Sequence, residues 1–254
     1  MNLQEHAIDE LGEVFYIPDF ITEEEEAYLI RKIQDAPQYN WKALANRRLQ
    51  LWGGQLTSKN VLLAQPLPSF VEVYPNILDR LKSSGAFSTS PHKVLNHIIL
   101  NEYLPGQGIM PHQDGPAYHP VVATISLRSH TAFHYYRYTT ENQDVLDATA
   151  RIIVPTPVLS VLLEPRSVII TSGSMYTSHL HGIQEQKVDH ITAGDGETGC
   201  PPKFTDLDVV VANWRLLTGT QVKSAMFKGG ALERGVRYSL TCRDVEKVAS
   251  SLKR

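Results

Sequence analysis

From residue 94 onward, hydrophobic and polar residues alternate with a period of two in several short stretches. The clearest run is Val94 to Tyr103, where every second side chain lies on the same face of an extended strand. Further strands are predicted at 121–127, 133–138, 158–163, 167–171 and 236–244, with proline and glycine between them. Many short strands at this spacing are typical of a sandwich, a barrel or a jelly roll.

The first third of the chain carries helix signals instead. Thr22 and Glu25 have the spacing of a capping box, and Pro37 ends the apolar stripe that follows. Because helices precede the strands instead of alternating with them, a doubly wound parallel sheet is not expected. We expect one integrated domain of the α+β class, mainly β. In it, residues 1–93 form an N-terminal extension, residues 94–254 form the core, and an insertion at about 189–235 delays the last strand.

Composition narrows the classes of partner. The formal net charge of −3 does not suit a bulk polyanion binder, so any nucleic-acid contact should be local. No apolar run approaches the ~18 residues of a membrane span, and the acidic N-terminus is neither a signal nor a transit peptide. Two cysteines make no disulfide framework. We expect a monomer of the cytoplasm and nucleus, without a membrane partner.

The segment at about 40–60 has a different character. It contains four cations and no acid, and its tryptophans and cations are interleaved. Two interpretations stay open: an exposed ribbon with ordinary charges, or a lid that stacks on a base and contacts phosphates. The second would make substrate contacts of Trp41, Arg47, Arg48 and Trp52.

His112 and Asp114 are two residues apart, so an extended strand places both side chains on one face. A neutral nitrogen and a carboxylate oxygen can take adjacent positions on a first-row divalent metal. His-x-Asp alone occurs often by chance. A third ligand would complete a two-His-one-carboxylate triad with three open positions, and His181 is the candidate, with His179 on the same strand face as its rival.

Other polar residues share strand faces near this pair. Asn101 and Tyr103 lie on one face just upstream, and Arg237 and Arg243 lie on one face of the last predicted strand. Arginine is suited to holding a carboxylate with two parallel hydrogen bonds in a buried pocket.

Together these motifs resemble the AlkB family of iron(II)- and 2-oxoglutarate-dependent dioxygenases. The matching stretches are Asn101-Glu102-Tyr103, His112-Gln113-Asp114, His181-Gly182-Ile183 and the run from Arg237 to Arg243. Leu104-Pro105-Gly106 and the run from Leu163 to Ser167 bring the chain closest to the branch called AlkB homologue six. The resemblance implies a double-stranded β-helix, or jelly roll, with the N-terminal helices packed on one sheet.

The resemblance also implies cofactors and roles. Iron(II) would be held by His112, Asp114 and His181, with dioxygen as the oxidant. The co-substrate 2-oxoglutarate would be bound by Asn101, Tyr103, Arg237, Ser239, Thr241 and Arg243, with its distal carboxylate on Arg237. The family often has asparagine where this chain has Ser239, which bears on the geometry of the co-substrate.

The implied reaction is oxidative demethylation of alkylated bases in RNA or DNA, releasing succinate, carbon dioxide and formaldehyde. A base must leave its stack to enter such a site, so the partner would be single-stranded or flipped-out methylated nucleic acid. Two alternatives stay open: a module that recognises modified RNA with little turnover, and a protein hydroxylase or demethylase.

Overall fold

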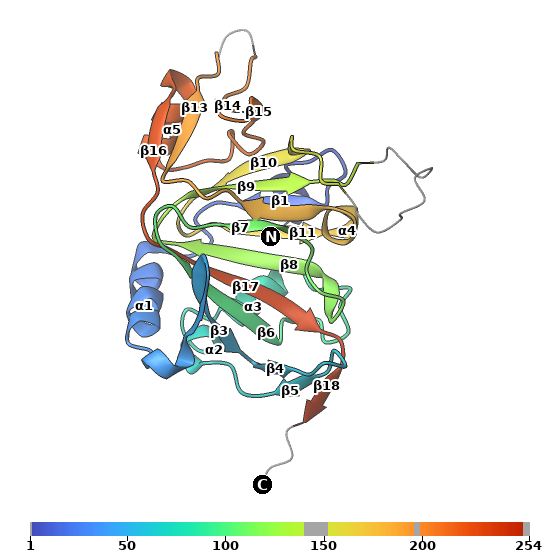
Figure 1. Ribbon diagram of the computed structural model, residues 1–254. Coiled ribbons are helices and arrows are strands. Elements are labelled where there is room, and N and C mark those ends of the chain that lie inside the picture. The colour runs from blue at the N-terminus through green and yellow to red at the C-terminus, as the bar shows by residue number, and fades with distance from the viewer. Residues whose placement is uncertain (1, 140–151, 196–198, 251–254) are drawn as a thin grey trace.

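Two antiparallel sheets form the centre of the molecule (Figure 1). The computed structural model describes residues 2–139, 152–195 and 199–250. In order across the sheet, the seven strands of the large sheet are β1 (Val14–Ile17), β11 (Val168–Ser172), β8 (Tyr118–Leu127), β17 (Arg237–Val245), β6 (His97–Tyr103), β3 (Arg47–Trp52) and β2 (Lys42–Leu44). The four strands of the small sheet are β10 (Leu159–Leu163), β9 (Thr131–Tyr136), β12 (Leu180–Ile183) and β7 (Ile109–His112).

The chain crosses between these sheets as a jelly roll does. β6, β8, β11 and β17 belong to the large sheet, whereas β7, β9, β10 and β12 belong to the small one. The fold prediction is therefore confirmed: the protein is α+β and mainly β, with a double-stranded β-helix at its core.

Alternation along β17 explains how one strand serves both core and cavity. Tyr238, Leu240 and Cys242 are buried in the main hydrophobic cluster, while the intervening side chains line a cavity between the sheets. Successive side chains of a strand point to opposite faces, so one sequence run supplies both surfaces.

Helices cover the face of the large sheet that is turned away from the cavity. They are α1 (Glu23–Gln34), α2 (Ser69–Glu72) and α3 (Ile77–Ser83). Leu29 and Ile33 of α1 and Leu81 of α3 join the same cluster as Leu240. The predicted capping box at Thr22 is present, and such a cap commonly contributes ~1 kcal/mol. Other short helical segments are η1 (Leu3–His6), η2 (Gln38–Asn40) and α4 (Gly173–Thr177).

Residues 1–93 are more than an extension, because β1, β2 and β3 are strands of the large sheet. β3 pairs with β6 through a register in which Leu49 lies opposite Asn101. A separate three-stranded sheet joins β4 (Gly54–Leu56) and β5 (Leu62–Ala64) to β18 (Val248–Ser250) near the C-terminus. The N-terminal segment therefore continues the jelly roll and brings new side chains to its cavity.

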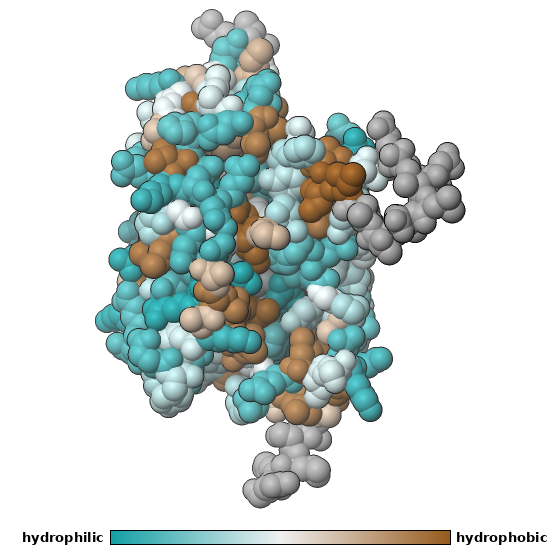
Figure 2. Space-filling model, in the orientation of Figure 1, coloured by the Kyte–Doolittle hydropathy of each residue, from teal (hydrophilic) through white to brown (hydrophobic). Residues whose placement is uncertain are grey.

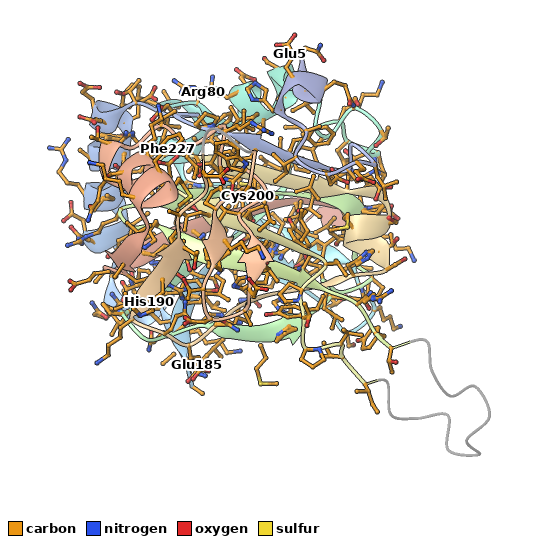
Figure 3. The ribbon with its side chains drawn as sticks, turned by 90° about the horizontal axis from the view of Figure 1, so that it is seen from above. Glu5, Arg80, Glu185, His190, Cys200 and Phe227 are labelled. Carbon is orange, nitrogen blue, oxygen red and sulfur yellow. The ribbon has the colours of Figure 1, made fainter. Side chains whose placement is uncertain are left out.

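The predicted insertion forms a layer of its own at the top of Figure 1. Its sheet contains β13 (Val188–Thr192), β14 (Lys203–Phe204), β15 (Val209–Val210) and β16 (Gly230–Glu233), and it carries the helix α5 (Thr220–Lys228). Figure 3 looks down on this layer, with Phe227 on α5 and His190 on β13 labelled.

Hydrophobic residues on the face shown in Figure 2 form separate patches among hydrophilic ones. Within the ranges that the structure describes, no helix has the length and apolar character needed to cross a bilayer.

Candidate active site

Three predicted ligands meet at one end of the small sheet. His112 on β7 and His181 on β12 are direct cross-strand partners, with ring centroids 4.4 Å apart. Asp114 lies two residues beyond the end of β7. One potential ligand atom from each of the three residues lies within 4.8 Å of the others. In the described part of the chain this is the only such group of three His, Cys, Asp or Glu residues.

Both histidines are placed to offer a ring nitrogen to a metal. Nδ1 of His112 lies 2.8 Å from the carbonyl oxygen of Met110, to which it can donate, and this leaves Nε2 free to act as a ligand. Burial lowers the pKa of His181 to about 4, so its imidazole is neutral at pH 7. Its ring stacks on Phe133, with centroids 5.5 Å apart. Two imidazoles and a carboxylate suit a first-row divalent metal such as iron(II), so the donor set fits the implied metal.

Asp114 is held by a buried arginine. Arg243 donates from Nε to one carboxylate oxygen at 2.9 Å and from Nη2 to the other at 2.5 Å. Burial, the largest single effect, would raise the pKa of Asp114, but Arg243 together with His181 and His112 outweighs it and keeps the pKa below its usual value. The carboxylate is therefore ionised, and its orientation is fixed by the two parallel hydrogen bonds.

His179, the rival ligand, lies apart from this group. Its Nδ1 lies 3.0 Å from the carbonyl oxygen of Ser174, within the turn that joins α4 to β12. The structure therefore brings His181, and not His179, to His112 and Asp114.

A cavity of about 390 Å³ lies beside the three residues, between the two sheets. All six residues predicted to bind the co-substrate line it: Asn101, Tyr103, Arg237, Ser239, Thr241 and Arg243. The six residues come from two adjacent strands. β17 pairs with β6, and Ser239 lies opposite Asn101 in that pairing. The cavity volume falls within the ~300–1,000 Å³ usual for small-molecule sites.

Arg237 has donors that no described residue satisfies. Its side chain is buried, and Nη2 donates to Oγ of Ser126 at 2.8 Å. Nε and Nη1 are buried without a hydrogen-bond partner among the residues that the structure describes. Burial lowers the pKa of Arg237 to about 10, which still leaves it charged at pH 7. A buried guanidinium with free donors is costly unless an anion completes it, so this residue fits a carboxylate ligand.

The basic segment at 40–60 does not behave as a single surface. Arg47 and Leu49 of β3 line the cavity, whereas Arg48 between them lies on the other face of the sheet, beside Glu102. Nε of Arg47 donates to Oδ1 of Asn101 at 3.1 Å. Of the four residues predicted to contact substrate, Arg47 alone lies on the cavity.

The other three do not line the cavity and have partners within the protein. Arg48 donates to both carboxylate oxygens of Glu102 at 2.9 and 2.7 Å and lies 4.1 Å from the ring centroid of Trp41. Trp52 is only 8% exposed and packs edge-to-face on Phe70, so it cannot stack on a base. Arg48 and Trp52 face away from the cavity because alternation sends sequence neighbours to opposite faces of β3, whereas Trp41 precedes β2.

Some residues that line the cavity were not predicted from the sequence. Tyr118, Val122 and Thr124 of β8 line the cavity with a period of two, a signal that was available in the sequence. Leu56 and Asn60 also line the cavity, from β4 and the turn after it. They lie far from the motifs in the sequence, and no periodic pattern around them indicated a place in the cavity wall.

Comparison with known proteins agrees with this geometry. A model of the 2OG-Fe(II) oxygenase superfamily matches residues 13–243. The Danio rerio protein named "Probable RNA/DNA demethylase ALKBH6" is 37% identical over 235 residues, covering 92% of this chain and 86% of that one. The Arabidopsis thaliana protein named "Alkylated DNA repair protein ALKBH8 homolog" is 28% identical over 187 residues, covering 70% of this chain and 52% of that one.

A solved structure described as "The structure of OsALKBH1" has the same fold. Its TM-score is 0.50 at 15% sequence identity, and the match covers 91% of this chain and 98% of that one. The residues matched by the superfamily model, 13–243, include the strands of the jelly roll and every motif that lines the cavity. The chain therefore belongs to the 2OG-Fe(II) oxygenase superfamily, in its AlkB homologue six branch, and is an oxidoreductase that uses iron(II), 2-oxoglutarate and dioxygen.

Proposed function

We propose that this enzyme removes methyl groups from alkylated bases of RNA or DNA by oxidation, and that it takes the base from a single strand or flipped out of a duplex. The observation that carries the proposal is the buried, incompletely partnered Arg237 in the same cavity as His112, Asp114 and His181. The name of the Danio rerio relative supports nucleic acid as the substrate class.

In this proposal His112, Asp114 and His181 hold the iron. Arg237 binds the distal carboxylate of 2-oxoglutarate with the donors that are free in the protein alone. Asn101 and Tyr103 lie beside it, and Ser239 is short enough to leave room for the carboxylate. When bound, iron(II) and 2-oxoglutarate with dioxygen supply the oxidation of an N-methyl group, with succinate, carbon dioxide and formaldehyde as products.

The protein itself orients the metal ligands and encloses the site with apolar side chains. Arg243 fixes the direction of the Asp114 carboxylate, and the Met110 carbonyl sets the tautomer of His112. Apolar side chains of Leu49, Phe133 and Ile183 wall the cavity against water. A base stacked in a duplex cannot reach these walls, which is why an extruded or unpaired base is proposed.

The test is a substrate panel under single-turnover conditions. Protein loaded anaerobically with iron(II) and 2-oxoglutarate is exposed to oxygen with methylated oligonucleotides or methylated peptides, and products are read by mass spectrometry. We expect loss of a methyl group from an oligonucleotide, and no loss with the Asp114→Ala variant. Methyl loss or hydroxylation confined to peptides would contradict the nucleic-acid proposal. Tight oligonucleotide binding without turnover would identify a binding module instead.

A further inference from the structure

The charges that line the cavity do not balance. Three guanidiniums face it, from Arg47, Arg237 and Arg243, and the only carboxylate among its lining residues is Asp114. Asp114 is already paired with Arg243. Within the described ranges, neither Arg47 nor Arg237 forms an ion pair with an acid. The protein alone therefore carries two positive charges in excess at this site.

Loading the site as proposed above leaves that excess unchanged. Iron(II) adds two positive charges, and 2-oxoglutarate adds two negative ones. Arg237 is then neutralised by a carboxylate, and Arg243 remains paired with Asp114. Arg47 is the guanidinium left without an anionic partner.

Arg47 lies between the co-substrate residue Asn101 and a wall of the cavity that no predicted co-substrate residue lines. It is half-buried on β3, and its neighbours on this side of the cavity are Leu49, Leu56 and Asn60, from β3, β4 and the turn before β5. Nε of Arg47 is engaged by the Asn101 amide oxygen, which holds the guanidinium in place. The polar groups on this wall are therefore a cation and an amide, without an acid.

We propose that this site selects a methylated base that is electrically neutral over a base that methylation has turned into a cation, and that Arg47 is the residue that sets this preference. The inference rests on the proposed demethylation and names its substrate class. An amide such as Asn60 can donate to and accept from the edge of a neutral base. A cationic ring meets the uncompensated, half-buried guanidinium, and like charges repel more strongly at a partly buried site than in bulk water. The same repulsion acts against methylated lysine side chains.

The size of the preference follows from one like-charge contact. At an effective dielectric constant of about 20 and a separation of ~6 Å, one such contact weakens binding on the order of a hundredfold, and screening by water at this half-buried site brings the effect closer to tenfold. Phosphates do not change the comparison when two ligands share the same backbone.

The test uses two oligonucleotides of identical sequence that differ only in the position of one methyl group. One contains N6-methyladenine, which is neutral, and the other contains 1-methyladenine, which is cationic at neutral pH. Affinity is measured by fluorescence anisotropy on protein loaded with manganese(II) and 2-oxoglutarate. We expect wild type to bind the neutral oligonucleotide about tenfold more tightly. Arg47→Gln should reduce this ratio severalfold, Arg47→Glu should reduce it further, and Arg47→Lys should retain it.

Lys42→Gln is the matched control, because Lys42 is an exposed cation on the neighbouring strand β2 and does not line the cavity. It should weaken both oligonucleotides equally and leave the ratio intact. The dissociation constant for 2-oxoglutarate, measured on each variant, shows that the cavity is still formed. Equal affinity of wild type for the two oligonucleotides, or a ratio unchanged in Arg47→Gln, would overturn the inference.

Formaldehyde release with iron(II) separates this inference from the proposed function. If the binding ratio is as expected but neither oligonucleotide is demethylated, charge selection stands and demethylation of these bases fails. If both are demethylated and bound equally well, demethylation stands and charge selection fails.

Discussion

At the scale of single residues, the account depends on which histidine completes the triad. His181→Ala should reduce metal affinity by at least about a hundredfold, because even changes behind a ligand commonly cost 10–100-fold. His179→Ala should have a small effect, since His179 contacts the Ser174 carbonyl oxygen and lies outside the group of three. Calorimetric titration of both variants with manganese(II) checks this.

His179→Ala is also the matched control, because it removes the same side chain two residues away. Full metal affinity in His181→Ala together with a loss in His179→Ala would contradict the assignment. Unfolding curves of both apo variants show whether either substitution acts through stability instead.

At the scale of elements, a buried ion pair joins the two ends of the insertion, between Asp189 on β13 and Arg234 just after β16. Arg234 donates to both carboxylate oxygens of Asp189 at 2.8 and 2.7 Å, and His130 of the β8–β9 turn lies 3.3 Å from the same carboxylate. Asp189→Asn leaves Arg234 buried without its counter-charge. It should cost about 3 kcal/mol of unfolding free energy, as breaking a buried pair commonly does.

Asp208→Asn makes the same change at an exposed ion pair with Lys203 in the same layer. It should change stability by less than ~1 kcal/mol. Denaturant unfolding measures both, and hydrogen exchange should localise the Asp189→Asn effect to β13 and β16. Equal effects of the two substitutions would contradict the view that burial makes the Asp189 pair important.

Elements also show where prediction from sequence succeeds. The strands that alternate over five or more residues, such as β6, β8 and β17, were expected near their observed bounds, because a buried face imposes period two. The strands of the insertion have two to five residues, too short for a period to appear. α5 was missed although Val222, Ala225 and Met226 have helical spacing, because nine residues form a weak signal.

The two interpretations of the segment at 40–60 stayed open for a different reason. Its cations and tryptophans are close in sequence, but a strand divides neighbouring residues between two faces. Only the pairing of β3 with β6 decides which of Arg47 and Arg48 faces the cavity, and that pairing joins residues about 50 positions apart. The motifs at Asn101, His112, His181 and Arg237 were easier to predict, because the residues of each motif are a fixed, short distance apart in the sequence.

At the scale of the whole molecule, buried histidines should make folding stability fall in mild acid. Burial lowers the pKa of both His97 and His134 to about 4, against an ordinary value of 6.5. The unfolded chain therefore binds more protons than the folded one between these values, and stability rises with pH over this range. Each histidine should cost up to about 3 kcal/mol as the pH falls from about 6.5 to 4.

Urea unfolding of the metal-free protein at pH 7, 6, 5 and 4 measures this loss. A His134→Gln variant removes one of the titrating groups, so its stability should fall less steeply with acid than that of wild type. Constant stability from pH 7 to 4.5 would contradict the prediction.

The central claim is that one cavity joins a metal triad to a guanidinium that binds the co-substrate. The most direct measurement is the affinity of 2-oxoglutarate for the manganese(II)-loaded protein, wild type against Arg237→Ala, Arg237→Lys and Arg215→Ala. Arg215 stacks on Trp214 in the insertion and serves as the control. Loss of a buried charged partner commonly costs ~3 kcal/mol, so Arg237→Ala should raise the dissociation constant on the order of a hundredfold. Arg237→Lys keeps the charge but lacks the planar guanidinium, so it should lose part of the affinity for 2-oxoglutarate. Arg215→Ala should lose none. Equal affinity in wild type and Arg237→Ala would mean that β17 does not hold the co-substrate, and the central claim would be wrong.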